Sequence, residues 1–290
     1  MNPSTTKQKP SGTNKIYCAD NLKILRSIPA GSIDLVYIDP PFNTKKTRTH
    51  TKLKTTQSIS GDRIGFGGKR YQTTKTGTLA YADFYTDYLN FLEPRLVAAY
   101  TALKKTGSLF FHIDYREVHY CKILLDGIFG RDNFQNEIIW AFDYGGRSKK
   151  RWSAKHNSIL WYTKDPKKYT FNYAEMDRIP YMAPGLVTKE KAARGKTPTD
   201  VWWHTIVATN GKERTGYPTQ KPLGVLRRIV SVHTKPGDTV LDFFGGAGSA
   251  GEAAALLGRK FILIDNNKAA TKISAKRLAK YKPECIGFKR

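Results

Sequence analysis

An apolar run ends abruptly on an acid, two prolines and an aromatic residue in the segment Ile33-Asp34-Leu35-Val36-Tyr37-Ile38-Asp39-Pro40-Pro41-Phe42. The hydrophobic part predicts a buried β-strand, and the prolines must end it because proline fixes φ and lacks the N–H that a sheet ladder needs. We therefore expect Asp39 at the carboxyl end of a strand. In an open α/β sheet that end is where ligands bind, although an ordinary exit from strand to loop would have the same pattern.

A second segment, near the other end of the chain, has the pattern of a nucleoside-binding site. The sequence predicts a strand over 238–243, then a turn rich in glycine and an alanine-rich helix. The next strand, over 261–264, leads into Asp265, about 20 residues after the first glycine, which is the spacing of an acid that binds a ribose. Glycines let the backbone approach a ligand closely, and the free amides of a helix N-terminus favour a carboxylate or phosphate.

Together the two segments resemble the DNA amino-methyltransferases, which transfer a methyl group from S-adenosylmethionine to an exocyclic base nitrogen. The tetrad from Asp39 to Phe42 matches that family's catalytic motif, and the segment from Phe244 to Gly248 matches its cofactor loop, Phe-x-Gly-x-Gly. The catalytic motif comes first, as in the permuted beta class. A third match, just ahead of the cofactor loop as in that class, is Tyr217-Pro218-Thr219-Gln220-Lys221-Pro222.

The resemblance implies a doubly wound, mostly parallel α/β sheet of the Rossmann-like methyltransferase type with an inserted target-recognition region. At 290 residues with 40% hydrophobic content, one large domain is expected rather than two. The strands that end near Asp39 and Phe243 should be neighbours, because both must face one pocket. We expect a disordered tail over 1–14, a catalytic half over 15–163, target recognition over 164–216 and a cofactor-binding half over 217–290.

The resemblance also implies roles for single residues. Asp39 and the carbonyl of Pro40 would accept the two hydrogens of the target amino group, and Phe42 would stack on the base. The catalytic residues implied are Asp39, Pro40, Pro41 and Phe42. The cofactor-binding residues implied are Asp20, Thr219, Lys221, Asp242, Phe244, Gly245, Gly246, Ala247, Gly248 and Asp265.

Three of these residues also have a structural interpretation. Asp20 is well placed to cap a helix predicted over 21–27, and in the resembled family it would bind the adenine of the cofactor. Thr219 is a plausible cap for a helix that has Pro222 in its first turn. Lys221 at a helix start opposes the helix dipole, so we expect it to bind the carboxylate of the cofactor, as the resemblance implies.

The charge of the chain predicts a polyanionic partner, namely double-stranded DNA. Lys and Arg number 49 against 24 Asp and Glu, which gives a net charge of +25. Nucleic acid is the usual polyanion that relieves such self-repulsion. No apolar run has the length of a membrane span and the N-terminus lacks a secretory h-region, so we expect a cytoplasmic protein. Three scattered cysteines indicate neither a disulfide framework nor a metal site.

Two basic segments are candidates for DNA contact. Residues 44–78 are rich in Thr, Ser and Gly and predict a long flexible loop, which includes Lys45 and Lys46. In the segment 143–156, basic residues alternate with aromatic ones, which suits phosphate contact combined with base stacking. Either segment could instead be a solvated loop. The basic residues singled out in the second are Arg147, Lys149, Lys150, Arg151 and Lys155.

The rest of the sequence predicts scaffold. Apolar residues at helical spacing predict helices over 82–103, bent or broken at Pro94, and over 117–129. A lysine-rich helix is expected over 267–281. His112 is interpreted as a satisfied core residue of a buried strand. Strands are predicted over 15–20, 108–114, 136–142 and 158–162.

Alternatives to an adenine-N6 enzyme remain open. A cytosine-N4 methyltransferase needs the same chemistry, but the family's cytosine members more often have serine in place of Asp39. A nicotinamide or flavin oxidoreductase would use the glycine turn and Asp265 but would leave the charge unexplained. A non-catalytic DNA-binding protein should have a broken tetrad or glycine loop, and both are intact. A homodimer and a companion restriction endonuclease are also compatible with the resemblance.

Overall fold

The computed structural model describes residues 14–43, 46–58, 60, 61, 63, 64, 70–83, 87–208 and 210–289. The tail predicted over 1–14 lies outside these residues except for Asn14, and Lys45 lies outside them too. Asn14 belongs to the folded domain, because its Oδ1 accepts a hydrogen bond from the backbone N–H of Phe261 at 3.1 Å. None of the helices in the described part of the chain has the length and apolar character needed to cross a membrane.

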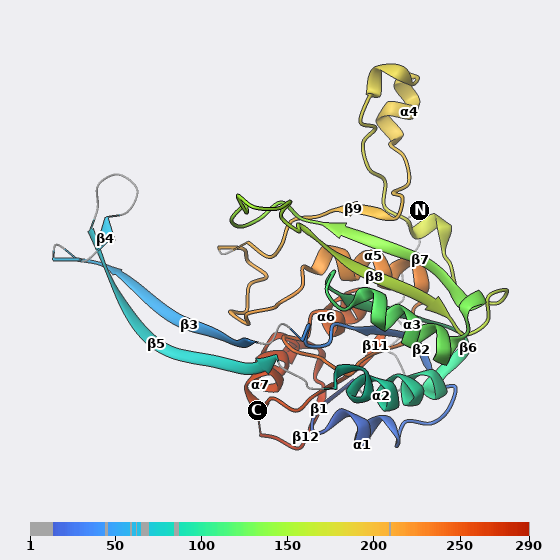
Figure 1. Cartoon of the computed structure of the whole chain (residues 1–290), viewed down its shortest axis with the longest axis horizontal. Helices are drawn as coiled ribbons and strands as arrows, with labels where there is room; N and C mark the ends of the chain where they lie inside the picture. Colours follow the sequence, from blue (N-terminus) through green and yellow to red (C-terminus); the bar gives the residue numbers. More distant parts are fainter. Residues whose placement is uncertain are drawn as a thin grey trace, which may run out of the picture.

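One sheet of nine strands forms the centre of the described molecule, in the order β12-β1-β11-β10-β2-β6-β8-β7-β9 (Figure 1). Neighbouring strands from β12 to β6 run parallel, β8 is antiparallel to β6 and β7, and β9 is parallel to β7. The predicted doubly wound, mostly parallel sheet is confirmed. Its strands are β1 (Lys15–Cys18), β2 (Ile33–Ile38), β6 (Leu103–Ile113), β7 (Phe134–Ala141), β8 (His156–Thr163), β9 (Val201–Trp203), β10 (Thr239–Asp242), β11 (Lys260–Asp265) and β12 (Glu284–Ile286).

Strand β2 lies in the middle of this sheet, and all of its residues are buried, as its apolar run predicts. It pairs in parallel with β10, with Leu35 opposite Val240. The predicted adjacency of the two strands is therefore confirmed, although they lie far apart in the chain. The acid within β2 strengthens this pairing, because Oδ2 of Asp34 accepts a hydrogen bond from the backbone N–H of Thr239 at 2.9 Å.

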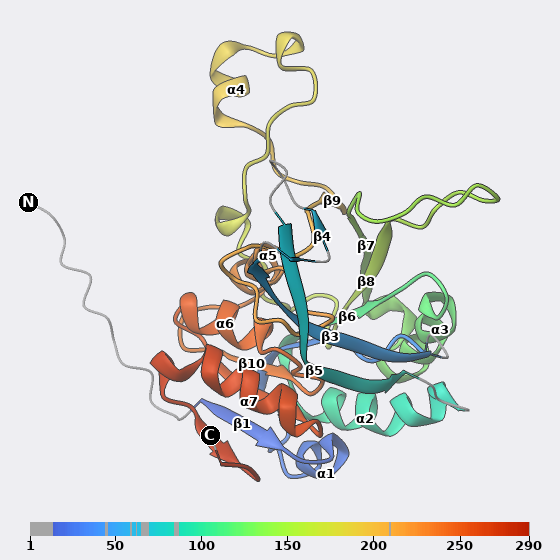
Figure 2. The ribbon, with the colours of Figure 1, turned by 90° about the vertical axis from the view of Figure 1, so that its left-hand side faces the viewer.

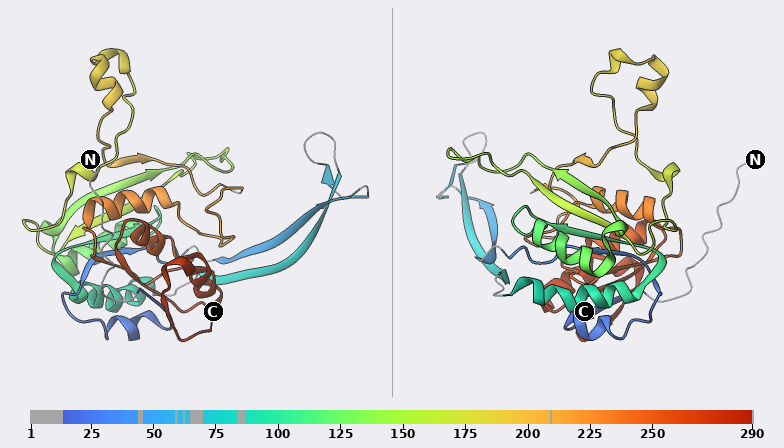
Figure 3. Two further views of the ribbon diagram at one scale, coloured as in Figure 1. Left: turned by 180° about the vertical axis from the view of Figure 1, so that it is seen from behind. Right: turned by 45° about the vertical axis from the view of Figure 1, so that its right-hand side comes forward.

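Helices cover both faces of the sheet (Figures 1 and 3). Helices α1, α2 and α3 share an apolar core with Val36 and Ile38 of β2, whereas α5, α6 and α7 share one with Leu35 and Tyr37. Successive strand residues point to opposite faces, so Tyr37 and Asp39 lie toward α5 and α6. The helices are α1 (Asn21–Leu25), α2 (Tyr88–Ala102), α3 (Val118–Phe129), α5 (Leu223–His233), α6 (Ser249–Leu256) and α7 (Lys268–Arg277).

The segment predicted as a long flexible loop over 44–78 is instead mostly β-structure. Strand β3 (Lys46–Gln57) pairs antiparallel with β5 (Arg70–Asp83), and β5 pairs with β4 (Arg63–Ile64). Figures 1 and 2 show this hairpin projecting from the body. The sequence prediction fails here because it depended on apolar alternation, which arises only where one strand face packs on a core. The many threonines of β3 favour a strand without that pattern.

Two helix starts also differ from the prediction. The helix expected over 82–103 begins at Tyr88, after Asp87 caps it by accepting the backbone N–H of Asn90, because β5 continues to Asp83. Pro94 lies inside α2, so the helix continues through it. The cap expected at Thr219 is wrong, since α5 begins after Pro222, and the backbone N–H of Leu223 in its first turn donates to Oε2 of Glu213 at 3.0 Å. The threonine is thereby left outside the helix, in the segment that leads to it.

The region predicted for target recognition, 164–216, has little regular structure. Besides β9 it holds the short helix α4 (Lys189–Arg194) and two 3-10 turns, η3 (Tyr173–Glu175) and η4 (Pro184–Leu186). Figure 2 shows the α4 segment standing out from the body as a narrow projection. At the base of this projection, Ile179 and Lys196 form an isolated antiparallel bridge. Elsewhere in the described residues lie the 3-10 turns η2 (Arg131–Asn133) and η5 (Ala279–Tyr281).

Candidate active site

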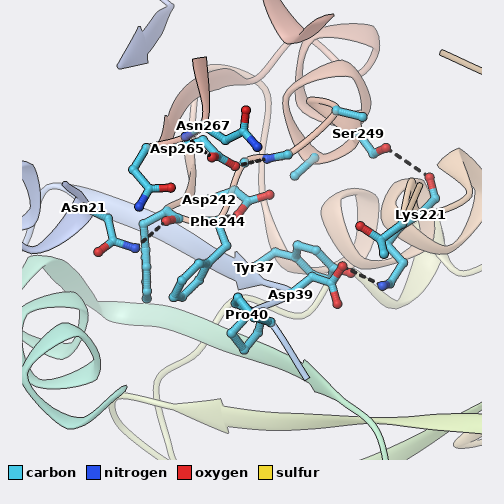
Figure 4. A pocket seen from close by; sticks show the side chains of 18 of the residues that line it. Asn21, Tyr37, Asp39, Pro40, Lys221, Asp242, Phe244, Ser249, Asp265 and Asn267 are labelled. Carbon is cyan, nitrogen blue, oxygen red and sulfur yellow. Dashed lines mark hydrogen bonds and ion pairs between the residues drawn. The ribbon is translucent and has the colours of Figure 1, made fainter. Parts of the chain in front are cut away.

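A cavity of about 500 Å³ lies where β2, β10 and β11 end (Figure 4). The parallel pairing of these strands brings their carboxyl ends to one edge of the sheet, as the sequence predicts. Thirteen of the fourteen predicted catalytic and cofactor residues line it, and the other, Gly248, lies next to it as the N-cap of α6. The remaining lining residues are Asn21, Tyr37, Phe91, Arg95, Tyr217, Gln220, Phe243, Ser249, Ala250, Asn266 and Asn267.

The glycine loop between β10 and α6 is shaped by Asp265. Its Oδ2 accepts the backbone N–H of Gly246 at 2.8 Å, and its Oδ1 accepts that of Asn267 at 2.8 Å. Gly246 and Gly248 have φ of +47° and +76°, a conformation that side chains disfavour. A Cβ on Gly248 would also lie only 3.0 Å from Oγ of Ser274. The carboxylate of Asp265 therefore holds the glycine loop in shape, in addition to ending β11.

Of the four acids that line the cavity, Asp242 is influenced by two others. Burial raises the pKa of Asp242 well above its ordinary value, and the neighbouring carboxylates of Asp39 and Asp265 raise it further, against the hydrogen bond from the backbone N–H of Phe244. Burial also raises the pKa of Asp265, against the two backbone hydrogen bonds that it accepts. The raised pKa of Asp242 favours its protonated form. A protonated carboxyl can donate a hydrogen bond as well as accept one.

The tetrad from Asp39 to Phe42 is held from two sides. The hydroxyl of Tyr88 on α2 donates to the carbonyl of Pro41 at 2.6 Å. Nζ of Lys221 lies 2.5 Å from Oδ2 of Asp39 and 4.8 Å from the ring centre of Phe42. Figure 4 shows this lysine facing the aspartate across the cavity. The structure thus pairs Lys221 with Asp39, a contact that the sequence interpretation did not include.

Asp20 lies where both interpretations of the sequence remain possible. It caps α1 by accepting the backbone N–H of Lys23 at 3.1 Å, and its side chain still lines the cavity. Arg95 of α2 lies 3.2 Å from Asp20 and donates to Oδ1 of Asn21 at 2.6 Å. Asn21 in turn donates to the carbonyl of Phe243 at 2.8 Å. This chain of contacts ties α1 and α2 to the end of β10.

Sequence reasoning missed several of the residues that line the cavity. Tyr37 could have been found, because it lies two residues before Asp39 on the same face of a strand. Arg95 and Asn21 had no local signal, since each belongs to a helix whose pattern only predicts scaffold. Their functional positions follow from how α1 and α2 pack against β10.

The predicted DNA-contact residues fall into groups with different surroundings. In the connection between β7 and β8, Nζ of Lys155 donates to the carbonyls of Tyr144, Gly145 and Gly146, and Arg147 pairs with Asp143 at 2.8 Å. These two cations stabilise the connection itself. The side chains of Lys149, Lys150 and Arg151 are exposed, and so is 99% of Trp152.

The β3–β5 hairpin and this connection reach out from the same side of the molecule, on the left in Figure 1. Lys46 is the first residue of β3, and Lys45 lies outside the described residues. Both segments therefore extend from the side on which β2 ends and the cavity lies. The arrangement agrees with a role in DNA contact, which remains a prediction.

Solved structures share this fold. The crystal structure of an M1.HpyAVI–SAM complex matches with a TM-score of 0.58 at 22% identity, over 91% of this chain and 98% of that chain. The PvuII DNA methyltransferase, which is cytosine-N4-specific, matches with a TM-score of 0.62 at 18% identity, over 93% of this chain and 89% of that one. This likeness shows that the chain has the Rossmann-like fold of these methyltransferases.

Sequence comparison identifies the family. The chain belongs to the DNA methylase family, whose model matches residues 33–276. Among curated relatives, the DNA adenine methyltransferase YhdJ of Escherichia coli (strain K12) is 29% identical over 270 residues, which cover 89% of this chain and 80% of the relative. The DNA methyltransferase family predicted from the sequence is therefore confirmed.

Proposed function

We propose that this protein transfers a methyl group from S-adenosylmethionine to the N6 amino group of adenine in double-stranded DNA, after the base has left the duplex. One observation carries the proposal: the tetrad that begins at Asp39 and the glycine loop held by Asp265 line a single cavity. A methyl donor bound at the loop and a base bound at the tetrad would thus meet, and methyl transfer requires this alignment.

The cofactor half of the cavity fits a nucleoside that bears an amino acid. A Cβ on Gly245 would lie 3.2 Å from Leu263, and one on Gly246 would lie 3.4 Å from Tyr217. A side chain at either position would therefore crowd these neighbours. Asp265 would bind the ribose hydroxyls and Asp20 the adenine, with Asp242, Phe244 and the loop around them. The bound cofactor supplies an electrophilic methyl group, and the M1.HpyAVI complex shows a structural neighbour with SAM bound.

The other half of the cavity suits an aromatic amine. Asp39 and the carbonyl of Pro40 would accept the two amino hydrogens, which directs the nitrogen lone pair toward the methyl group, and Phe42 would stack on the ring. Lys221 must first leave Asp39, because its Nζ lies 2.5 Å from Oδ2. The carboxylate of the cofactor is the anion that we expect to attract it. Binding of the cofactor would then free the catalytic acid for the base.

Adenine is the target that the sequence favours. Asp39 is typical of the family's adenine members, and YhdJ is a DNA adenine methyltransferase that aligns over most of this chain. The cytosine-N4-specific PvuII enzyme has 18% identity, and it shares the fold alone. The proposal also includes double-stranded DNA as the substrate, a cytoplasmic location and a companion restriction endonuclease. It further assigns target recognition to residues 164–216.

Incubation of the purified protein with duplex DNA and S-adenosylmethionine carrying a labelled methyl group tests the proposal. Digestion of the DNA and mass spectrometry of the nucleosides should find the label in N6-methyladenine. An Asp39→Ala protein, treated in the same way, should give none. Label in N4-methylcytosine would overturn the choice of base, and the absence of label in any nucleoside would overturn the activity.

A further inference from the structure

Beneath the catalytic tetrad, three polar side chains form a hydrogen-bonded row across neighbouring strands. The hydroxyl of Tyr37 on β2 lies 2.8 Å from Nδ1 of His112 on β6. Nε2 of His112 lies 3.0 Å from the amide nitrogen of Asn157 on β8. All three side chains are buried. Rings of Phe42 and Trp140, at 5.9 and 5.4 Å from the imidazole, enclose the row.

The chemistry of these groups sets the direction of each hydrogen bond. Burial and the nearby Lys221 cation lower the pKa of His112 well below its ordinary value, so the imidazole is neutral and carries one hydrogen. The amide nitrogen of Asn157 can only donate, which makes Nε2 the acceptor and leaves the hydrogen on Nδ1. Nδ1 therefore donates to the oxygen of Tyr37. The hydrogen of the Tyr37 hydroxyl is then directed away from His112.

Tyr37 lies at the part of the cavity where the base would bind. Tyr37 lines the same cavity as Asp39 and Phe42, and lies on the same face of the chain as Asp39, two residues further on. Figure 4 shows the two side chains next to each other. Burial raises the pKa of Tyr37 well above its ordinary value, with a contribution from Asp39, so the phenol keeps its hydrogen. A neutral donor is thus fixed beside the group that would hold the amine.

We propose that Tyr37 recognises the target base by donating a hydrogen bond to the ring nitrogen next to the amino group, which in adenine is N1. His112 and Asn157 are positioning residues that fix the direction of this donor. The inference rests on the proposed function and adds a specificity element to it. A base with an N–H at this position, such as guanine or hypoxanthine, would place two donors against each other and is rejected for that reason.

Single-turnover methylation with two proteins and two DNA duplexes tests this inference. The proteins are the wild type and Tyr37→Phe, and the duplexes contain either adenine or 1-deazaadenine at the target position. Removal of either the hydroxyl or N1 should slow methylation by about tenfold, the size of one buried hydrogen bond. Removal of both should cost no more than the loss of N1 alone, because the two atoms form one interaction. The 1-deazaadenine duplex has weaker base pairing for both proteins. This effect therefore cancels when the two proteins are compared on that duplex.

Three outcomes are decisive. Equal rates of wild type and Tyr37→Phe on adenine would overturn the inference, and so would the same tenfold loss on both duplexes, since that loss would be structural. Failure of the wild type to methylate adenine would instead overturn the proposed function. The two failures are therefore distinguishable.

A variant that reverses the direction of the hydrogen bonds in the row gives a second test and keeps the Tyr37 hydroxyl in place. In Asn157→Asp, assayed above the pKa of His112 in that variant, the carboxylate accepts the single hydrogen of the neutral imidazole from Nε2, so Nδ1 becomes the acceptor of the Tyr37 hydrogen. This variant should lose about tenfold on adenine and nothing on 1-deazaadenine. The matched control Asn136→Asp, at the far end of β7, should methylate both duplexes as the wild type does. Full activity of Asn157→Asp on adenine would contradict the assigned direction.

Discussion

Asp39 and Asp265 are both carboxylates at the carboxyl ends of strands and line the same cavity, yet their partners differ. Asp265 accepts hydrogen bonds from two backbone amides, those of Gly246 and Asn267. Asp39 instead has the side-chain ammonium of Lys221 within 2.5 Å. Sequence patterns of the same kind, an apolar run that ends on an acid, thus produce two different environments.

The difference separates a structural role from a reactive one. Backbone amides cannot leave Asp265 without unfolding the glycine loop, so its position is part of the fold. A lysine side chain has rotatable bonds and can exchange one anion for another, so Asp39 can change partners during a reaction. We expect substitutions at the two acids to affect different steps, namely catalysis at Asp39 and cofactor binding at Asp265.

The largest expected effect is at Asp39. Asp39→Ala should slow methyl transfer by more than about 10³-fold, because the carboxylate acts on the target amine during transfer. Cofactor affinity should change by less than about threefold, since Asp265 and the loop stay in place. Single-turnover methylation and calorimetric titration with S-adenosylmethionine measure the two quantities. Appreciable turnover in the variant would show that the tetrad is structural. The proposed contrast between a reactive Asp39 and a structural Asp265 would then be lost.

At Asp265 the expected effect is on binding. Asp265→Ala removes a charge-assisted contact to the ribose, worth about 1.5–3 kcal/mol, and the support of the Gly246 amide, so cofactor affinity should fall by about 10–100-fold. DNA affinity should not change. Asp265→Asn keeps one acceptor oxygen and should give an intermediate loss. Calorimetry that finds wild-type cofactor affinity in the alanine variant would mean that the acid only ends its strand.

The connection between β7 and β8 shows a similar contrast, between cations that have partners and cations that are exposed. Arg147 and Lys155 have partners within the connection, whereas Lys149, Lys150 and Arg151 are exposed. Neutralising these three together should weaken binding to every DNA sequence alike, because such residues mainly contact phosphates. The slope of log affinity against log salt should flatten by roughly 0.9 for each lost contact.

A matched control for this experiment lies at the opposite end of β8. Lys105, Lys167 and Lys168 are exposed there, and their neutralisation should leave the slope unchanged. A changed site preference with an unchanged slope in the first variant would instead make the connection a base reader. Target recognition would then be shifted from residues 164–216.

The smallest effect concerns Asp242, the third acid, whose pKa is raised well above the ordinary value mainly by burial. Between the pKa of the unfolded chain, about 3.9, and the raised value, the folded protein keeps this proton and the unfolded chain releases it. The free energy of unfolding should therefore fall as the pH rises through this window. Asp242→Asn cannot titrate and keeps an acceptor for the N–H of Phe244, so its stability relative to the wild type should increase with pH.

Urea unfolding of both proteins between pH 4 and pH 8 measures this difference. Asp265 and Asp238, whose pKa values are also raised, are present in both proteins, so their own titration largely cancels. A stability difference that does not change with pH would show that Asp242 is ionised throughout. It would then resemble Asp39 in charge state, and the comparison between the acids would have to be revised.

Local sequence patterns determined the individual strands β2, β10 and β11 and most of the cavity wall, and the sheet and the adjacency of β2 and β10 followed from the family resemblance. The reason is that the strands and the wall depend on short signals: a buried strand reads as an apolar run, prolines end it, and positive φ requires glycine. Asp39 and Asp265 could therefore be placed at one edge of the sheet from the sequence. The family resemblance added the expected roles of the residues around them.

Only the tertiary structure decided which residues meet in pairs. The contact of Lys221 with Asp39, the support of the loop by Asp265 and the row from Tyr37 to Asn157 join elements that are far apart in the chain. The same holds for the β3–β5 hairpin, whose strands are stabilised by pairing with each other and carry no periodic apolar pattern. Such contacts depend on strand order and register, which the whole core determines, so no short segment of the sequence contains them.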